Sequence, residues 1–206
     1  MTFGLPSTAL VGRTMPKKAF YEHLEVPAYI KDQFVHDIER IELVAALKES
    51  SVHIPAGKDV AEIDVLRIHL KGDGVAVPAA ALDLIARAVP NKLVFACFGG
   101  RGCKFLIRRD RLYEAAWMPP NEARLLLCGF TLDELWDSLC AQMVFGDANP
   151  VNFEERLQRA NEVVLLQERL KKLQKKRLTE KQIVRRNALW DQIKSIENRI
   201  TELEAR

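Results

Sequence analysis

The composition of the chain changes abruptly at Asn152. From there to Arg206 the sequence contains no Gly and no Pro, and only Phe153 and Trp190 are aromatic. In the second half of this stretch, apolar residues follow one another at alternating steps of four and three: Leu189, Ile193, Ile196, Ile200 and Leu203. Such a spacing is typical of a coiled-coil seam. The last quarter of the chain is therefore expected to form long helices rather than part of a globular core.

Two arrangements of these helices satisfy the pattern. One straight helix would leave the seam exposed and require a dimer, whereas an antiparallel hairpin buries the seam within one chain. Thr179 and Gln182 resemble a capping box in the middle of the segment. Reflecting the sequence about residue 178 brings apolar residues opposite one another: Leu157 and Ile200, Val163 and Ile193, Leu173 and Ile183. We expect the hairpin, over residues 151–206, with its turn near residues 177–180.

The expected turn is strongly basic. Residues 151–206 hold 14 Lys and Arg against 9 Asp and Glu, a net charge of +5, whereas residues 1–150 hold 17 against 19, a net of −2. Around the turn the only acid is Glu180, and the basic residues are Lys171, Lys172, Lys175, Lys176, Arg177, Lys181, Arg185 and Arg186. Such a cluster can contact nucleic-acid phosphates or an acidic protein surface, or it can be a solvated helix surface. Without interleaved aromatic residues, any nucleic-acid binding would be independent of sequence.

Residues 1–150 predict a compact domain of α+β or α/β class, with helices covering a mixed sheet. Ile30, Phe34, Ile38 and Ile41 step by three and four residues, which predicts a helix over residues 29–47. Further helices are expected at 17–24, 78–89 and from Thr131, where Glu134 would complete a capping box. Strands are expected at residues 52–54, 60–71, 92–98, 103–109 and 112–117.

The strand over residues 60–71 changes phase at Leu66, which indicates either a bulge or a strand buried on both faces. The glycine-rich residues 99–102 predict a turn between the strands at 92–98 and 103–109. A four-residue loop would place Cys97 and Cys103 on opposite faces of the sheet. Residues 99–102 could also be read as a phosphate-binding loop. They join two strands, however, and lack the Lys-Ser/Thr of such a loop, so a turn is the favoured interpretation.

The cysteines, Cys97, Cys103, Cys128 and Cys140, are even in number but contain no CxxC spacing. No segment resembles a secretory signal, and no apolar run approaches the ~18 to 20 residues that span a bilayer. We therefore expect a cytoplasmic protein without a membrane partner, with reduced and buried thiols. None of the four His lies at zinc-ligand spacing from a Cys, so neither a metal nor a cofactor is expected.

The long strand at residues 60–71 carries the residues that come nearest to a catalytic site. A nuclease of the restriction-enzyme type holds a divalent metal with an acid on one strand and an acid-x-Lys sequence on the next. Glu62, Asp64 and Lys71 come nearest, but Asp64 and Lys71 are seven residues apart. We assign no catalytic residue and expect a protein that is not an enzyme, with a degenerate metal-dependent nuclease as an alternative.

Several segments along nearly the whole chain resemble a bacterial family catalogued as domain of unknown function 4391. The segments that carry the resemblance are Phe3-Gly4-Leu5-Pro6-Ser7-Thr8, residues 16–24, residues 62–71, Ala88-Val89-Pro90, Trp117, Lys181-Gln182 and Asn187. The resemblance implies a gene that lies beside helicases, DNA methyltransferases and restriction-like components in a bacterial defence region. The resemblance implies no catalytic residues that could be carried over.

From the resemblance and the hairpin together we expect a non-catalytic accessory or adaptor subunit of an anti-phage defence or restriction-type complex. The hairpin would dock on a helicase, a DNA methyltransferase or another defence subunit, with DNA as a further contact. The alternatives are the degenerate metal-dependent nuclease and a protein that binds nucleic acid irrespective of sequence through the basic turn.

Overall fold

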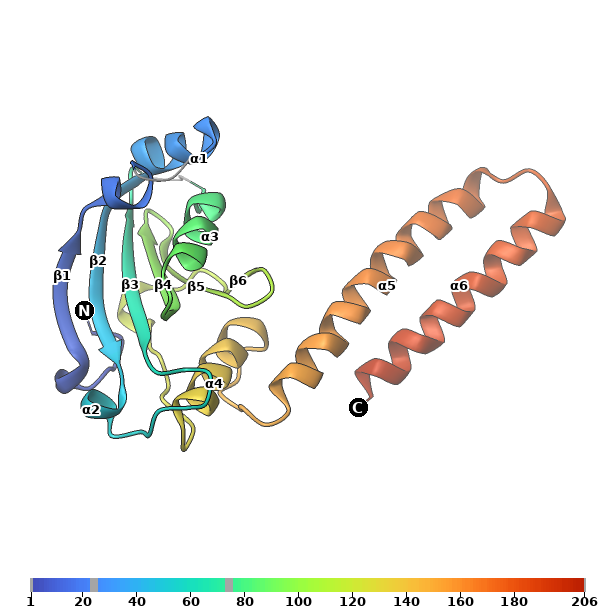
Figure 1. The fold of residues 1–206 in the computed structure, drawn as a ribbon. Helices are drawn as coiled ribbons and strands as arrows, with labels where there is room; N and C mark the ends of the chain where they lie inside the picture. The colour runs from blue at the N-terminus through green and yellow to red at the C-terminus, as the bar shows by residue number, and fades with distance from the viewer. Residues whose placement is uncertain (1, 23–25, 73–75, 206) are drawn as a thin grey trace. The chain divides into compact units, whose positions relative to one another are not determined.

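The structure is a computed structural model that describes residues 2–22, 26–72 and 76–205 (Figure 1). The chain divides into two compact units, Met1–Val151 and Asn152–Arg206. None of the helices within the described residues is both long enough and apolar enough to cross a membrane.

The first unit is built on one sheet whose strand order follows the sequence. The strands are β1 (Leu10–Met15), β2 (Ile38–Leu47), β3 (Ile63–Leu70), β4 (Lys92–Gly99), β5 (Gly102–Arg108) and β6 (Leu112–Glu114). Strands β3 and β4 pair in parallel, and the other neighbours pair antiparallel. A parallel pair requires a crossover, and helix α3 (Ala79–Ala88) supplies it. The mixed sheet with helices confirms the expected α+β class.

The main core lies between the sheet and helix α3. Ala81, Leu82 and Ile85 of α3 are fully buried and share one apolar cluster with residues of four strands. The strand residues of this cluster include Ile41, Ile68, Phe95, Cys97 and Leu106. Burial of this apolar surface stabilises the fold by about 25 cal/mol per Å² removed from water. On the opposite face, the ring of Phe3 lies 6.0 Å from Phe98 and 5.3 Å from Phe105.

Helix α4 (Leu132–Val144) begins where the sequence predicted. The hydroxyl of Thr131 accepts a hydrogen bond from the Glu134 amide at 3.3 Å, which is the N-cap. The Glu134 carboxylate accepts from the amide of Phe130 at 2.8 Å, one residue earlier than a capping box requires. The apolar face of α4 is buried throughout: Leu132, Leu135, Trp136, Leu139 and Met143.

The helix expected over residues 29–47 is wrong in its second half. Helix α1 (Ala28–Asp32) continues only as a π-helical turn, Gln33–Asp37, and residues 38–47 form strand β2. The register of β2 against β3 shifts between Ile38 and Arg40. This bulge lets Ile38 and Ile41 both enter the core beside α3, although residues three positions apart in a regular strand point to opposite faces. A spacing of three between buried residues is also found in helices, and for this reason the sequence pattern wrongly predicted a helix here.

Smaller corrections concern short elements. Residues 52–54 are not a strand, because helix α2 (Glu49–Val52) ends there with His53 in the left-handed region at φ 57°. Strand β6 is shorter than the predicted 112–117, and Met118 instead bridges to Cys103. The helix expected at 17–24 is a short 3-10 helix, Lys17–Phe20, and residues 23–24 lie outside the described part. Other 3-10 turns are Ser7–Ala9 and Pro120–Glu122.

Strand β3 is buried on both faces. Ile63 and Val65 are buried on one side, and Leu66, Ile68 and Leu70 belong to the cluster against α3 on the other. Its pairing with β4 is regular, so the phase change at Leu66 marks a central strand and not a bulge. In the β4–β5 hairpin, Phe98 pairs with Cys103 and Cys97 with Lys104, so Cys97 and Cys103 lie on opposite faces of the sheet as predicted.

The second unit is an antiparallel pair of helices, α5 (Phe153–Thr179) and α6 (Ile183–Glu204), joined by residues 180–182 (Figure 1). Arg199 of α6 donates from Nε to Oε1 of Glu162 in α5 at 3.0 Å. The predicted α6 seam is buried throughout: Leu189, Ile193, Ile196, Ile200 and Leu203. The chain thus turns back on itself, and the single straight helix is excluded.

Candidate partner-docking site

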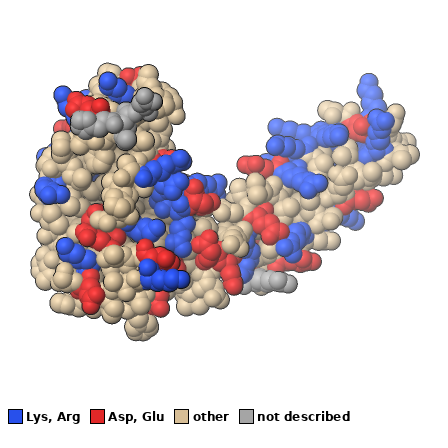
Figure 2. All heavy atoms as spheres, viewed as in Figure 1, with Lys and Arg blue, Asp and Glu red and all other residues tan. Residues whose placement is uncertain are grey.

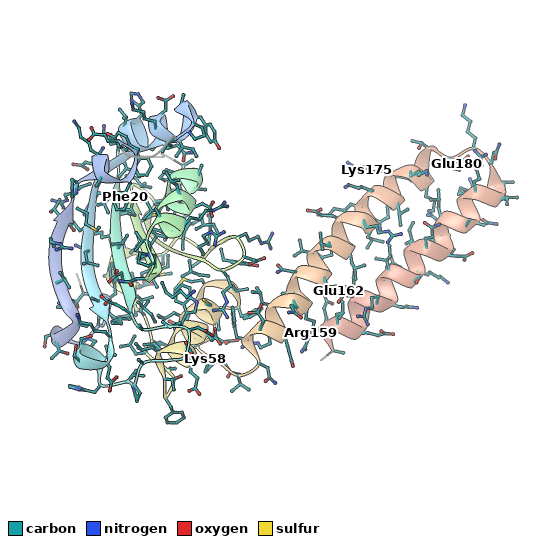
Figure 3. The ribbon with its side chains drawn as sticks, in the orientation of Figure 1. Phe20, Lys58, Arg159, Glu162, Lys175 and Glu180 are labelled. Carbon is teal, nitrogen blue, oxygen red and sulfur yellow. The ribbon has the colours of Figure 1, made fainter. Side chains whose placement is uncertain are left out.

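The eight basic residues singled out in the sequence gather at the end of the hairpin where α5 meets α6. This region, residues 171–190, is called the hairpin tip below. Figure 2 shows Lys and Arg crowding it, and Figure 3 places Lys175 on the last turns of α5 and Glu180 at the connection. Seven of the eight are exposed, and Arg177 is half-buried. Within the described residues none of the eight takes part in a salt bridge.

Glu180, the only acid among these residues, does not neutralise them. Its carboxylate accepts a hydrogen bond from the amide of Gln182 at 2.9 Å, which supports the connection between the helices. The hydroxyl of Thr179 donates to the carbonyl of Lys176 at 3.1 Å, and Gln182 provides no side-chain cap. The predicted capping box at Thr179 and Gln182 is therefore wrong, and the tip keeps a concentrated positive charge.

Trp190 links the two helices at the tip. The guanidinium carbon of Arg177, in α5, lies 4.5 Å from the centre of the Trp190 ring, in α6. Lys194, one turn further along α6, has its ammonium 5.5 Å from the same ring. Both are cation–π contacts, which attract a cation to the negative face of the ring. Trp190 itself remains 40% exposed.

Three large aliphatic side chains are exposed at the tip: Leu178 at 82%, Ile183 at 65% and Val184 at 82%. The expected pairing of Leu173 with Ile183 in the seam is wrong, because Ile183 faces solvent. Sequence reasoning missed these side chains as a surface feature. The signal was present, since all three flank a turn that is otherwise charged.

Side chains at the tip line shallow hollows, and two of these hollows contain Arg in their lining. The first, of about 500 Å³, is lined by Arg177, Leu178, Arg186, Asn187 and Trp190. The second, of about 300 Å³, is lined by Lys176, Glu180, Arg185, Ala188, Leu189 and Gln192. Both combine apolar surface with guanidinium groups. This chemistry suits a ligand that carries carboxylates or phosphates beside an apolar group.

Two of the three nuclease candidates of the first unit, Glu62 and Asp64, lie close to each other, but Lys71 does not join them. The Asn91 amide donates to Oδ2 of buried Asp64 at 3.0 Å, whereas Lys71 follows the other end of β3 and donates to the carbonyl of Val35 at 2.6 Å. Burial, and then the neighbouring Asp64 carboxylate, raise the pKa of Glu62. Among the described residues, no group of three or more His, Cys, Asp or Glu is placed to hold a metal ion.

A second charged cluster, which the sequence did not reveal, centres on Glu42 of β2. Its carboxylate accepts from Arg67 at 3.1 Å and lies 3.3 Å from Nε2 of His69, both on β3. Arg40 reaches the other carboxylate oxygen at 3.0 Å. Burial alone would raise the pKa of Glu42, but the hydrogen bond from His69 and the charges of Arg40, His69 and Arg67 lower it overall.

The rings of Phe3 and Phe98 each lie 5.5 Å from the guanidinium carbon of Arg67. Arg67 thus contacts the Glu42 carboxylate and also the two aromatic rings. We interpret the Glu42 cluster as a network that stabilises the sheet. In the sequence, the Glu42 cluster is indicated only by the alternation of charged and apolar residues at Arg67 and His69 of β3.

The first unit also has a pocket of about 480 Å³ at the start of β4, between the end of α3 and the start of α4. Its cations are balanced: Arg108 donates to Asp83 at 2.7 Å, and Arg109 lies 2.8 Å from Asp137. Because basic and acidic side chains line it together, the pocket has no clear preference for either charge. The hairpin tip, in contrast, has an unbalanced charge.

The family comparison covers almost the whole chain. A family model described as Domain of unknown function (DUF4391) matches residues 3–200. The chain belongs to the DUF4391 family. This confirms the resemblance drawn from the sequence, and the match includes both the sheet domain and the hairpin. No curated protein and no solved structure was found to match. The DUF4391 description names no activity, so a functional conclusion must come from the molecule's own surfaces.

Proposed function

We propose that this DUF4391 chain is a non-catalytic adaptor subunit that binds a partner protein through the hairpin tip. The proposal rests on two features that occur together at the tip. Eight basic residues form no salt bridge within the described residues, and the side chains of Leu178, Ile183 and Val184 are exposed beside them. Exposed apolar groups rimmed by charge are typical of protein-interaction sites.

The fold of the hairpin does not require these aliphatic side chains. In α6 the buried seam begins at Leu189 and runs to Leu203, whereas Ile183 and Val184 precede it and face solvent. Keeping three large aliphatic groups in water forgoes the free energy of burying them, about 1.5–3 kcal/mol for each. A partner that covers them recovers this free energy, which supports binding as their role.

The aliphatic groups also favour a protein over a nucleic acid as the main partner. Cations alone suffice to contact a phosphate backbone, and such contacts gain nothing from Leu178 or Val184. Nucleic-acid binding through the basic residues is the second candidate, because eight cations meet a single acid in this stretch. The two candidates differ in which side chains they need.

The cellular setting is part of the same proposal. We place the adaptor in a bacterial anti-phage defence or restriction-type complex, docking on a helicase, a DNA methyltransferase or another subunit of that complex. The support for this setting is the gene neighbourhood expected for the family together with a hairpin suited to docking.

The test is affinity capture of the tagged full-length chain from its own host, with and without nuclease treatment. The tip variant replaces Leu178, Ile183 and Val184 with Ser. The matched control replaces Val164 and Leu165 with Ser, which are also exposed on α5 but lie outside the tip. We expect the wild type and the control to retain defined, nuclease-resistant protein partners that the tip variant loses.

Partners retained equally by all three proteins would refute a role for the tip in docking. Partners that disappear with nuclease would favour the nucleic-acid candidate. In that case, affinity for a DNA duplex should fall steeply with salt and fall again when Lys175, Lys176 and Arg177 are changed to Glu, while the Ser variant of the tip still binds.

A further inference from the structure

The hollow lined by Arg177, Leu178, Arg186, Asn187 and Trp190 differs from the other hollow at the tip in having an aromatic side chain in its lining. Its volume of about 500 Å³ exceeds what one large side chain fills. Trp and Arg are among the residue types enriched at the positions that dominate the binding energy of protein interfaces. Here a Trp and two Arg line one hollow.

From this we propose that the hollow, called the Trp190 hollow, docks a short acidic peptide segment of a partner protein that inserts one large apolar side chain. The inference rests on the proposed adaptor function and names the class of partner segment that the tip recognises. Leu178 and Trp190 contact the inserted side chain, and Arg177 and Arg186 bind carboxylates that flank it.

The acidic character of the segment follows from charge complementarity. Between Lys171 and Arg186 the chain has eight basic residues and one acid, and Glu180 is already hydrogen-bonded to the backbone of the connection. Opposite charges across an interface speed association and exclude wrong partners. A second copy of the same tip would bring like charges together, so a symmetric tip-to-tip dimer is disfavoured.

The geometry leaves the guanidinium groups able to bind. The guanidinium carbon of Arg177 lies 4.5 Å from the centre of the Trp190 ring, and the N–H groups of a guanidinium point outward from its edge. Arg186 is exposed and has no salt bridge among the described residues. Both can form the two-pronged hydrogen bonds that carboxylates favour. The amide of Asn187, on the same side, can bond the peptide backbone.

An acidic peptide without an apolar residue would bind only by charge, and an apolar peptide without acids would meet a cationic rim. Both requirements together distinguish the inferred segment from nucleic acid, which supplies phosphates but no aliphatic or aromatic side chain to insert. They also define the sequences that a selection should recover.

The experiment is a selection from a displayed library of random 12-residue peptides on the full-length chain, with counter-selection against the Trp190→Ala variant. We expect the recovered peptides to share an apolar residue flanked by Asp or Glu. In fluorescence anisotropy, their affinity should fall by about tenfold or more with Trp190→Ala or Arg186→Glu, the scale of an interface hot spot. Arg169→Glu, an exposed position on α5 outside the hollow, is the matched charge control and should change affinity by less than about threefold.

Circular dichroism of each variant checks that α6 is retained, and Trp190→Phe should recover part of the affinity. Peptides that lack either feature, that bind Trp190→Ala equally well, or that are not enriched over the counter-selection would overturn the inference. So would a DNA duplex that competes better than the selected peptides. If host partners still require Leu178, Ile183 and Val184, failure of the selection refutes the Trp190 hollow alone and leaves the adaptor proposal standing.

Discussion

The carboxylate of Asp133 occupies the space in which residue 57 would carry a side chain. An ideal Cβ built on Gly57 lies 2.2 Å from Cγ of Asp133, far closer than two carbons can approach. The same carboxylate accepts hydrogen bonds from the amides of Lys58 and Asp59 at 2.6 and 3.2 Å. The Asp133 side chain, in the first turn of α4, therefore holds the loop before β3. Only glycine at position 57 leaves room for it.

This relationship predicts that Gly57→Ala destabilises the first unit by about 1–3 kcal/mol, the range for overpacking. In an Asp133→Ala background the same substitution should cost less, because the clash is gone. The wild type, the two single variants and the double variant form a double-mutant cycle, and chemical denaturation of these four proteins gives the coupling free energy between the two positions. Equal costs of Gly57→Ala in both backgrounds would contradict the proposed contact.

A second prediction concerns the seam of the hairpin. Ile193 is 1% exposed, so Ile193→Ala should leave a cavity and cost about 2–5 kcal/mol. The neighbouring Gln192 is exposed, and Gln192→Ala should leave stability almost unchanged. Thermal and denaturant melts followed by circular dichroism measure both. If the two substitutions had the same effect, Ile193 would not be a core residue of the seam.

The Glu42 cluster predicts a loss of stability in acid. Because its folded-state pKa lies below the ordinary value of 4.5, ionised Glu42 contributes stability above that pH. The contribution is lost as the pH falls through the lower folded-state pKa. The free energy of unfolding, measured by denaturant titration at pH 7 and at pH 3, should therefore change less with pH in Glu42→Gln than in the wild type. Identical pH profiles would argue against this account of Glu42.

The cysteines should differ sharply in reactivity. Burial raises the pKa of Cys97 beyond the physiological range and that of Cys103 to about 12, whereas Cys128 is partly exposed. Because the thiolate is the reactive form, a thiol-specific disulfide reagent at pH 8 should modify Cys128 first. Cys97, Cys103 and Cys140 should react only after unfolding. Rapid modification of a Cys128→Ser variant under native conditions would show that the buried thiols are accessible.

The hairpin could be predicted from the sequence because its determinants are local. The heptad spacing from Leu189 to Leu203 fixes the inner face of α6, and one partner helix suffices to bury it. The helix α4 could be predicted for the same reason, since Thr131 caps it and its apolar face repeats regularly. Patterns of this kind need no knowledge of distant residues.

Strand β2 could not be predicted this way. Its bulge after Ile38 and its burial between β1 and β3 depend on pairing with residues 63–70, far along the chain. The bulge interrupts the alternation by which strands are recognised, so Ile38 and Ile41 suggested a helix. The Glu42 cluster was hidden for the same reason, because β2 and β3 bring Glu42 and Arg67 together only in the folded sheet.

At the proposed docking site, too, some features follow from the sequence and others only from the tertiary structure. The sequence by itself determined that the tip is basic and that two helices meet there, because charge and heptad spacing are properties of neighbouring residues. Only the tertiary structure decided that Ile183 faces solvent, that Arg177 lies over Trp190 and that a hollow forms between them. These features arise from the register of α5 against α6, which is fixed by contacts such as Arg199 with Glu162 between residues distant in sequence.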